Sequence, residues 1–592
     1  MDNVTSSSIF FLQQHKEQLK ALGIPNNLLT LLFHKLDSGI FDAGDYFQFC
    51  EIPDEFFPKN GRKNPYGLVC KKEEGLKMNS NIFVIDHDFT ANKEDIMQTI
   101  STVPQLLAEY EENFGLNTEG KSPLERIEQF YKVQWEYNFP LRLLNKDTKE
   151  EELAWYLVDN VGNSIIYSKT GNCKLVPFFF MPHEKFYTLL FPIKDIEYAH
   201  LITSDYLSPL QLLEDFYNVI PLRNRFAEAH HEVISFVEER KSHVPNQSDE
   251  PYNLELVQQE YKTAPYRIFT HNNLLKEKMT IDIFKFAEDI DNADFLMFDN
   301  TLENEDFETI KGTHAWVNQV QAQDKFLSSA ELTLILRKYY GEKFEEMLEP
   351  TYDLSKPESC ASYVEKYFLS EEEGKPNYWV VRPVLRKHQK CFGLFDDITP
   401  VIKIGNSVPV TVCQLSPKPL LVNNKKFDFT VTILVKYDEM WESKKVDVYM
   451  CDNFVVRVAQ KEFSMKNLWD YEALFTQINC GNGIVSVDST EFEEVYKKEH
   501  EKLCGWNELL QRMRNNLGHI FNAMVKSNVL TPEVSSCALY SVDFEVDDQF
   551  HTRAKEFYLH TDYSKDIERD DQFLNNVFST AFLESKDFKQ VY

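Results

Sequence analysis

The stretch KKFDFTVTILV (residues 425–435) decides the fold of the C-terminal half, because its polar and apolar side chains alternate. The odd-numbered residues from 427 to 435 are Phe, Val or Ile and share one face of an extended chain. Asp428, Thr430 and Thr432 share the other face. This pattern predicts a strand with one face in a core and the other face lining a polar surface.

The segments after this strand predict further strands of the same sheet. VDVYMCD (446–452) is expected to pair with it. ALYSVDFEV (538–546) and EFYLHTDY (556–563) are joined by an acidic turn, which favours an antiparallel pair. Before this pair in the sequence, CGWNELLQRMRNNLGHIFNAMV (504–525) carries apolar residues at helical spacing and predicts an amphipathic helix.

The segments before this strand extend the mixed pattern. YRIFTHN (266–272), ADFLMFDN (293–300) and YWVVRP (378–383) are short β-rich runs. AELTLILRKYYG (330–341) reads as a helix that ends at a glycine. We therefore predict a single α/β domain over residues 263–592.

The N-terminal half has a different composition. Residues 1–64 form a predicted helical segment, and residues 65–239 form a mixed, mainly β module. A helical insert at about 93–115 and 122–137 interrupts this module. Residues 240–262 are polar and rich in proline, and are predicted to be a linker.

One turn inside the β module carries a specific prediction. WYLVDNVGNSII (155–166) contains Asn160 and the pair Gly162–Asn163 between two apolar runs. Asn and Gly favour the positive φ angles of tight hairpin turns. The sequence thus predicts a β-hairpin here.

The charge and the cysteine pattern exclude several classes of protein. The 592-residue chain has a net charge of −31, which disfavours non-specific binding to nucleic acid or to an anionic membrane surface. Its 10 cysteines include no CxxC pair, so a structural zinc site is not expected. No apolar run approaches the length of about 18 residues that a membrane span needs. We expect a cytoplasmic protein with neither nucleic acid nor membrane as a partner.

The order of the C-terminal segments resembles the tubulin–tyrosine ligase-like family of ATP-grasp enzymes. Members of that family show, in sequence order, a Lys-Pro strand, an adenine-side hinge, a Lys-Phe-Asp-Ile-Arg strand, a late strand with Asp and a final Glu-Val-Asn strand. The matching segments here are VVRP (380–383), CQLSPKPLLV (413–422), KKFDFTVTILV, LYSVDFEV (539–546) and LHTDY (559–563).

The N-terminal half resembles the SET-like module that precedes the ligase domain in part of this family. HKLDSGIFDAGDYF (34–47) and FFFMPHEKFYTLLFPIKD (178–195) are among the segments that carry this resemblance. The resemblance implies an α+β protein, in which a SET-like, mainly β module is followed by an ATP-grasp, tubulin–tyrosine ligase-like α/β domain.

The resemblance also implies candidate site residues for ATP and Mg²⁺. The residues on the nucleotide side are Arg382, Cys413, Gln414, Leu415, Ser416, Lys426 and Asp428. The residues on the metal side are Asp543, His560 and Asp562.

Several of these positions depart from the family pattern. Arg382 replaces the phosphate-binding lysine, Thr430 replaces the arginine of the Lys-Phe-Asp-Ile-Arg strand, and Pro417 replaces the hinge glutamate. His560 and Asp562 stand in place of Glu and Asn, and imidazole is a poor ligand for Mg²⁺. These departures predict a ligase fold without ligase activity.

The resemblance implies tubulin or microtubules as the partner, and a regulator of microtubule dynamics and tubulin modification as the function. Because tubulin is acidic, such a binder needs local cations, and Arg386, Lys387 and Lys390 follow the YWVVRP strand. The other interpretation of these three residues is a solvated loop.

Two other function classes remain open at this stage. One is an active ATP-dependent amino-acid ligase with a rearranged site. The other is a SET-type lysine methyltransferase in the N-terminal module, which needs an Asn-His segment. The nearest such runs are HNN (271–273), outside the module, and NVGN (160–163).

Overall fold

The structure is a computed structural model. It describes residues 6–52, 66–90, 100, 103–136, 138–144, 151–168, 170–183, 185–204, 265–311, 315–384, 391–437, 446–477, 484–530, 533–560, 563–583 and 588–592. The chain divides into two compact units, which are described separately. The N-terminal unit comprises Met1–Phe236 and Ile398–Val408, and the C-terminal unit comprises Val237–Asp397 and Pro409–Tyr592.

In the N-terminal unit, short helices cover one face of a five-stranded sheet. The helices are α1 (Ser6–Gln14), α2 (Lys16–Ala21) and α3 (Leu29–Ser38), whereas Ala43 of the short helix α4 (Ala43–Tyr46) packs with Phe83 and Leu190 of the other face. The sheet has the order β3 (Phe83–Ile85), β9 (Lys185–Pro192), β8 (Cys173–Phe180), β10 (Thr203–Ser204) and β7 (Ile166–Tyr167). Phe11 and Leu32 of the helices share one core with Phe178 and Leu189 of the sheet.

Two smaller sheets and the helical insert complete this unit. The sheets are β1 (Phe47–Glu51) with β2 (Tyr66–Cys70), and β4 (His87–Thr90), β6 (Glu151–Val158) and β5 (Phe139–Leu144). The insert forms α6 (Pro104–Asn113) and α7 (Pro123–Val133), as predicted. Helix α16 (Ile398–Ser407) also belongs to this unit, and Lys403 Nζ donates to the backbone oxygen of Asn138 at 3.0 Å.

The predicted hairpin at Asn160–Asn163 is wrong, because this segment forms a helical turn, α8. The Asp159 side chain accepts a hydrogen bond from the Gly162 amide at 2.9 Å and caps the turn. An N-terminal cap of this kind competes directly with a hairpin turn. The strands on either side therefore enter different sheets, with β6 beside β4 and β5 and β7 beside β10.

A buried histidine makes the N-terminal unit sensitive to pH. The His15 side chain is 1% exposed, with Nδ1 3.0 Å from the Phe11 carbonyl oxygen, and its Nε2 accepts from the Met181 amide at 3.2 Å. Burial lowers the pKa of His15 from its ordinary 6.5, although the bond to Phe11 opposes this shift. Because the fold favours the neutral ring, this contribution is complete above pH 6.5 and is lost as the pH falls below it.

We therefore expect the His15→Phe variant to show a weaker loss of stability than the wild type between pH 7 and pH 5. The difference in slope has an upper limit of about 1.4 kcal/mol per pH unit, the value for one proton. Thermal unfolding at several pH values measures it. His34→Phe, at an exposed histidine, is the matched control. Equal slopes for the wild type and His15→Phe would contradict the prediction.

The C-terminal unit is built on a large mixed sheet. Its main path runs through β12 (Phe284–Phe286), β11 (Tyr266–Thr270), β13 (Phe295–Met297), β14 (Trp316–Val317), β24 (Ser536–Val546), β20 (Lys425–Tyr437), β21 (Val446–Cys451) and β26 (Phe588–Gln590). The strands β19 (Leu421–Val422), β22 (Val455–Val458), β23 (Val485–Asp488) and β25 (Thr552–Leu559) branch from it. The predicted pairing of β20 with β21 is confirmed, and so is the predicted antiparallel pair of β24 and β25.

A second, antiparallel sheet has four strands. Its order is β15 (Thr351–Asp353), β18 (Val410–Gln414), β16 (Trp379–Pro383) and β17 (Gly393–Phe395). The YWVVRP run therefore forms a central strand of this sheet, with Arg382 opposite Thr411.

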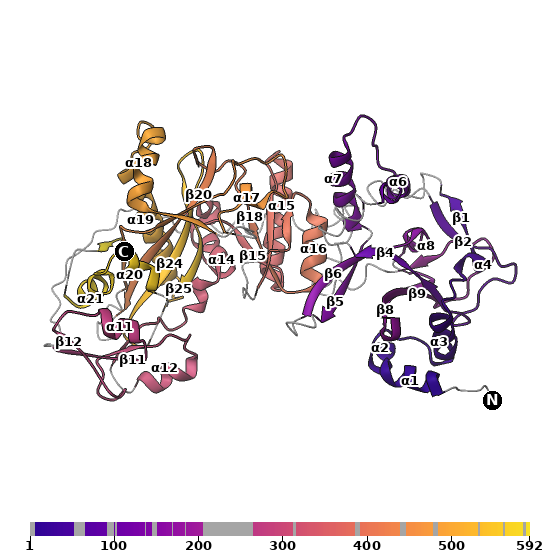
Figure 1. Cartoon of the computed structure of the whole chain (residues 1–592), viewed down its shortest axis with the longest axis horizontal. Coiled ribbons are helices and arrows are strands. Elements are labelled where there is room, and N and C mark those ends of the chain that lie inside the picture. The colour runs from indigo at the N-terminus through magenta and orange to yellow at the C-terminus, as the bar shows by residue number, and fades with distance from the viewer. Residues whose placement is uncertain are drawn as a thin grey trace. The chain divides into compact units, whose positions relative to one another are not determined.

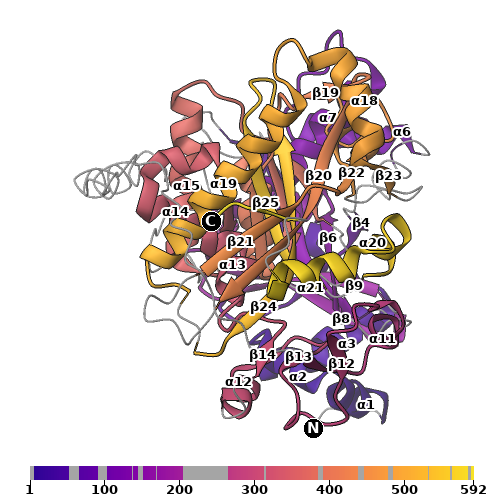
Figure 2. The same cartoon turned by 90° about the vertical axis from the view of Figure 1, so that its left-hand side faces the viewer.

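The two faces of the large sheet have different partners. Helices α14 (Ser329–Tyr340) and α19 (Trp506–Lys526) pack against the odd-numbered residues of β20 and the even-numbered residues of β24, as the alternation predicts. On the opposite face, α21 (Phe573–Leu583) packs against Leu434 and Leu539. Figure 1 and Figure 2 show α19 and α21 with the sheet between them. Asp428, Thr430 and Asp543 lie further along the same face as α21, so this face is apolar at one end and polar at the other.

Three other predictions concern parts of the chain that are described only partly. The linker at 240–262 lies outside the described residues. Among the described residues, no group of three or more His, Cys, Asp and Glu side chains is arranged to hold a metal ion. No described helix is both long and apolar enough to cross a membrane.

Candidate functional site

Two adjoining polar pockets lie in the C-terminal unit, between the polar face of β20 and β24 and the four-stranded sheet. Arg382, Lys555 and Glu556 line both of them. The first is further lined by Lys426, Asp428, Phe475, Thr476, Gln477 and Asp543. The second is further lined by Glu349, Thr351, Thr411 and Cys413.

Strand register and a β-bulge place the acidic residues of these pockets. Asp543 on β24 lies opposite Glu556 on β25, and the register then shifts so that Phe544 lies opposite Ala554. Lys555 is the extra residue of this bulge. Neighbouring residues of a regular strand point to opposite faces, and a bulge re-aims one of them. Lys555 and Glu556 therefore both line the pockets.

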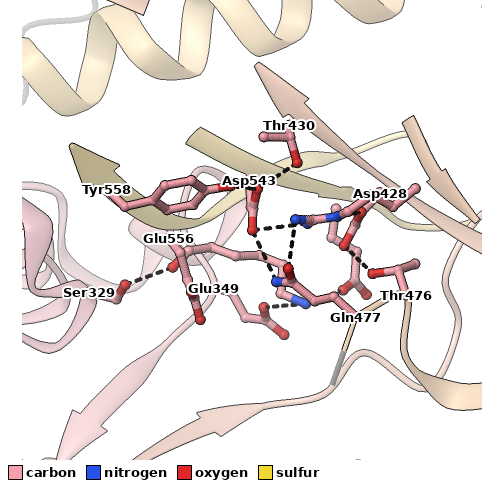
Figure 3. A network of polar contacts seen from close by, with 12 residues as sticks. Ser329, Glu349, Asp428, Thr430, Thr476, Gln477, Asp543, Glu556 and Tyr558 are labelled. Carbon is pink, nitrogen blue, oxygen red and sulfur yellow. Dashed lines mark hydrogen bonds and ion pairs between the residues drawn. The ribbon is translucent and has the colours of Figure 1, made fainter. Parts of the chain in front are cut away.

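Asp543 is surrounded by hydrogen-bond donors of the protein itself (Figure 3). Its Oδ1 accepts from the Tyr558 hydroxyl at 2.7 Å and from Thr430 Oγ1 at 2.9 Å. Its Oδ2 accepts from Gln477 Nε2 at 3.3 Å and lies 2.9 Å from a guanidinium nitrogen of Arg457. Both carboxylate oxygens of this 1% exposed residue are thus engaged.

Arg457 bridges two buried carboxylates. It lies opposite Asp428 in the pairing of β20 with β22, and its Nε donates to Asp428 Oδ1 at 2.6 Å. Asp428 Oδ2 accepts from Thr476 Oγ1 at 2.5 Å. A guanidinium therefore lies between Asp428 and Asp543 and balances part of their charge.

The lysines of the site are paired in the same way. Lys426 Nζ, on a side chain that is 1% exposed, lies 3.0 Å from Glu545. Lys555 Nζ lies 2.9 Å from Glu545 and 3.5 Å from Glu349. Although burial alone would raise it, Lys426 and Lys555 together lower the pKa of Glu545 from 4.5 to about 2.

Arg382 is held by an acid rather than left facing the pocket alone. Its Nη1 forms an ion pair with Glu556 across the two sheets.

Burial raises the pKa of Asp543; Arg457 opposes this shift, and the nearby carboxylates Asp428 and Glu556 raise the pKa further. The cluster of Arg382, Lys426, Arg457 and Lys555 with Glu349, Asp428, Asp543, Glu545 and Glu556 thus holds four cations and five carboxylates.

The structure brings together four of the residues predicted for the nucleotide side. Arg382, Lys426 and Asp428 line the first pocket and Cys413 lines the second. Gln414, Leu415 and Ser416 do not line either pocket. The Gln414 and Leu415 amides donate to the backbone oxygens of Pro350 and Tyr378, and Leu415 is buried in a small apolar cluster.

On the metal side, Asp543 and His560 have different hydrogen-bond partners. His560 is bonded to Ser541 Oγ and Asp566 Oδ2, both at 2.7 Å, two residues beyond Tyr558. The register places Glu556 opposite Asp543, and LHTDY (559–563) begins three residues further along the chain. Asp562, Arg386, Lys387 and Lys390 lie outside the described residues.

Five charged residues of the cluster are absent from the sequence prediction: Glu349, Arg457, Glu545, Lys555 and Glu556. For two of them, the surrounding sequence contains a pattern that could have predicted a place in the site. Arg457 lies in the apolar run FVVRVA, and Glu545 shares a strand face with Asp543 by alternation. Lys555 and Glu556 could not be placed in this way, because the bulge breaks the alternation.

These residues do not fit a magnesium–triphosphate group. Mg²⁺ requires free oxygen acceptors in near-octahedral geometry, whereas four donors occupy the Asp543 oxygens and Arg457 takes the position between the carboxylates. A triphosphate requires cations, and each of the four here already has a carboxylate partner. The cleft in this arrangement therefore offers a binding position to neither group.

Comparison with known proteins supports the assignment of both halves. The tubulin tyrosine ligase SET-like domain matches residues 58–210, and the tubulin-tyrosine ligase family matches residues 320–589. Tubulin–tyrosine ligase-like protein 12 of Mus musculus is 23% identical over 98% of this chain and 95% of its own length. The protein of that name from Caenorhabditis elegans is 22% identical over 98% and 97%.

A shorter similarity points in the same direction. A probable tubulin polyglutamylase of Mus musculus is 28% identical over 24% of this chain and 25% of its own length. A large mixed sheet and a four-stranded antiparallel sheet around a charged pocket, preceded in the sequence by the match to a SET-like domain, agree with these findings. The chain belongs to the tubulin–tyrosine ligase-like family.

Proposed function

We propose that this protein is a cytoplasmic, tubulin-directed regulator that binds tubulin or microtubules without ligating an amino acid to them. The observation that carries the proposal is that protein donors already engage both oxygens of the Asp543 carboxylate. Both of its carboxylate oxygens accept hydrogen bonds or ion pairs from Thr430, Gln477, Arg457 and Tyr558. An acidic residue whose two carboxylate oxygens are both engaged by the protein is a structural element of the cleft.

The charge balance of the cleft supports the same proposal. In ATP-dependent ligation, the protein mainly positions the phosphates and neutralises their charge. Here five carboxylates accompany four cations, so the formal charge of the cluster is negative before any phosphate binds. Losing one charge contact to a reacting group costs about 2–4 kcal/mol of transition-state stabilisation.

One observation favours the second candidate, an active ATP-dependent amino-acid ligase. Glu556 lies opposite Asp543 and both line the first pocket, so the cleft contains two carboxylates on neighbouring strands. In that alternative, Arg457 and Tyr558 move aside when a nucleotide and Mg²⁺ bind. The names of the relatives, a tyrosine ligase-like protein and a probable polyglutamylase, leave the transferred amino acid open.

A ligation assay separates the two candidates. Purified protein is incubated with tubulin, ATP, Mg²⁺ and labelled tyrosine or glutamate, beside an Asp543→Asn variant of confirmed fold. We expect no incorporation above this control, while the wild type still co-sediments with microtubules. Incorporation that Asp543→Asn abolishes would establish the ligase instead.

A thermal-shift titration with ATP and Mg²⁺ tests the nucleotide separately. A ligand at 100 times its Kd stabilises a protein by about 2.7 kcal/mol, which is easily detected. We expect no such shift in the wild type. A saturable shift that Lys426→Met removes would show that the cleft binds the nucleotide.

We expect reversal of the charges at Arg386, Lys387 and Lys390 to weaken co-sedimentation with microtubules about tenfold or more, because an acidic partner needs local cations on a chain of net charge −31. The matched control reverses three exposed lysines elsewhere, Lys338, Lys343 and Lys502. The effect should decrease with added salt. Equal binding by the two triple variants would show that this cationic run is a solvated loop.

A further inference from the structure

Helix α16 is part of the N-terminal unit, but the chain on either side of it belongs to the C-terminal unit. The chain enters α16 from β17 and leaves it into β18, two strands of the four-stranded sheet. Asp396 and Asp397 separate the helix from β17, and Val408 and Pro409 separate it from β18. Because each residue of a chain spans at most about 3.6 Å, connections this short have little slack. A displacement of α16 is therefore passed on to these two strands.

The N-terminal unit holds α16 through Lys403. Its Nζ donates to the backbone oxygen of Asn138 at 3.0 Å and to Asn138 Oδ1 at 3.2 Å. Asn138 is buried, and its own Nδ2 donates to Gln134 Oε1 at 2.8 Å. Val401 and Ile404 of the same helix are fully buried, so the helix cannot leave its position without exposing apolar area.

The C-terminal unit holds the chain immediately after the helix. The Pro409 backbone oxygen accepts a hydrogen bond from the Val384 amide at 3.2 Å, and the Val410 oxygen accepts one from the Leu354 amide at 3.0 Å. Val384 directly follows β16, the strand that carries Arg382. The end of α16 is thus bonded to the end of the strand that delivers Arg382 to the cleft.

The strands joined to α16 form a wall of the second pocket. Thr411 and Cys413 of β18 line this pocket together with Arg382 of β16. Strands β17 and β18 lie on the two sides of β16. A continuous series of short connections and hydrogen bonds therefore leads from Asn138, through Lys403 and the end of α16, to the lining of the pocket.

We propose that α16 is a coupling element through which the N-terminal unit controls the opening of β16 and β18 at the second pocket. Loosening of the contact between Asn138 and Lys403 releases α16 and lets these strands open more often. A partner of the N-terminal unit that strengthens this contact has the opposite effect. This inference goes beyond the proposed function, because it holds whether or not the cleft binds tubulin.

Hydrogen–deuterium exchange of the full-length protein, followed by mass spectrometry, tests the inference. We expect Lys403→Met to accelerate exchange about tenfold in residues 134–144, 379–384 and 410–414, because hydrogen bonds to a charged group limit local opening. Asn138→Ala leaves the backbone acceptor in place and should accelerate exchange about threefold in the same segments. In residues 379–384 and 410–414, the double variant should exchange no faster than Lys403→Met, because the contact is already lost.

The matched control is Lys366→Met. Lys366 lies on helix α15 (Pro357–Glu372) of the C-terminal unit, is 15% exposed and pairs with Glu345 at 2.5 Å. Its loss should leave exchange in residues 134–144 unchanged, which separates the effect of α16 from that of any lost lysine contact.

The effect of Asn138→Ala on the distant strands decides the outcome, and it also does so if Lys403→Met does not fold. Faster exchange confined to residues 134–144 overturns the inference, because the loosened contact would then not reach the pocket. Equal acceleration along the whole chain also overturns it, because it would reflect global destabilisation. The samples contain neither tubulin nor ATP, so the result is independent of the proposed function.

Discussion

Replacement of Arg457 by methionine is expected to lower the free energy of unfolding of the C-terminal unit by about 3–5 kcal/mol, the typical cost of breaking a buried ion pair from one side. The Arg457 side chain is 7% exposed and contacts Asp428 at 2.6 Å and Asp543 at 2.9 Å. Without the guanidinium, both buried carboxylates lose their cation. Methionine keeps much of the volume, so the effect reports charge rather than a cavity.

Urea unfolding at pH 7 measures this effect. Arg512→Met is the matched control, because Arg512 pairs with Glu508 one helical turn away on an exposed surface. Surface pairs of this type contribute less than about 1 kcal/mol. Adding Asp543→Asn to Arg457→Met should recover part of the loss, because it removes one uncompensated charge. Equal stabilities for Arg457→Met and Arg512→Met would show that Arg457 is not a structural counter-ion.

The second large effect concerns Lys426, which is almost fully buried beside Glu545. We expect Lys426→Met to cost about 2–3 kcal/mol, less than Arg457→Met, because Lys555 still compensates Glu545 at 2.9 Å. The double variant Lys426→Met, Glu545→Gln measures the coupling between the two residues. If the two single effects simply add, the ion pair does not contribute to stability.

The ion pair of Lys426 and Glu545 also predicts how the stability of the protein changes at low pH. Because the pKa of Glu545 falls from 4.5 to about 2 in the folded protein, its contribution is complete above pH 4.5 and is lost as the pH falls toward 2. The difference between these two values corresponds to about 3 kcal/mol. Since Lys426 is the larger cause that lowers this pKa, Lys426→Met should lose less stability than the wild type between pH 4.5 and pH 3. Parallel pH profiles would contradict this assignment.

The sequence predicted the fold because its main signals are local. Alternation in residues 425–435 set the two faces of β20, and the helical spacing of residues 504–525 predicted α19. Both patterns survive folding because burial of apolar area acts on every residue of an element in the same way. At Asn160–Asn163 the local prediction failed, since the Asp159 side chain capped a helical turn where a hairpin was expected.

The sequence by itself determined the family, the faces of the main strands, and the presence of Arg382, Lys426, Asp428 and Asp543 at one cleft. Only the tertiary structure decided which residues lie opposite these four side chains or form ion pairs with them. Glu556 rather than Lys555 lies opposite Asp543, because one bulge at Lys555 shifts the register of β25 by one residue. Arg457 reaches Asp543 because β22 pairs with β20, a contact between strands that no local pattern specifies. Register and bulges depend on pairing between distant segments, so they appear only when the sheet is assembled.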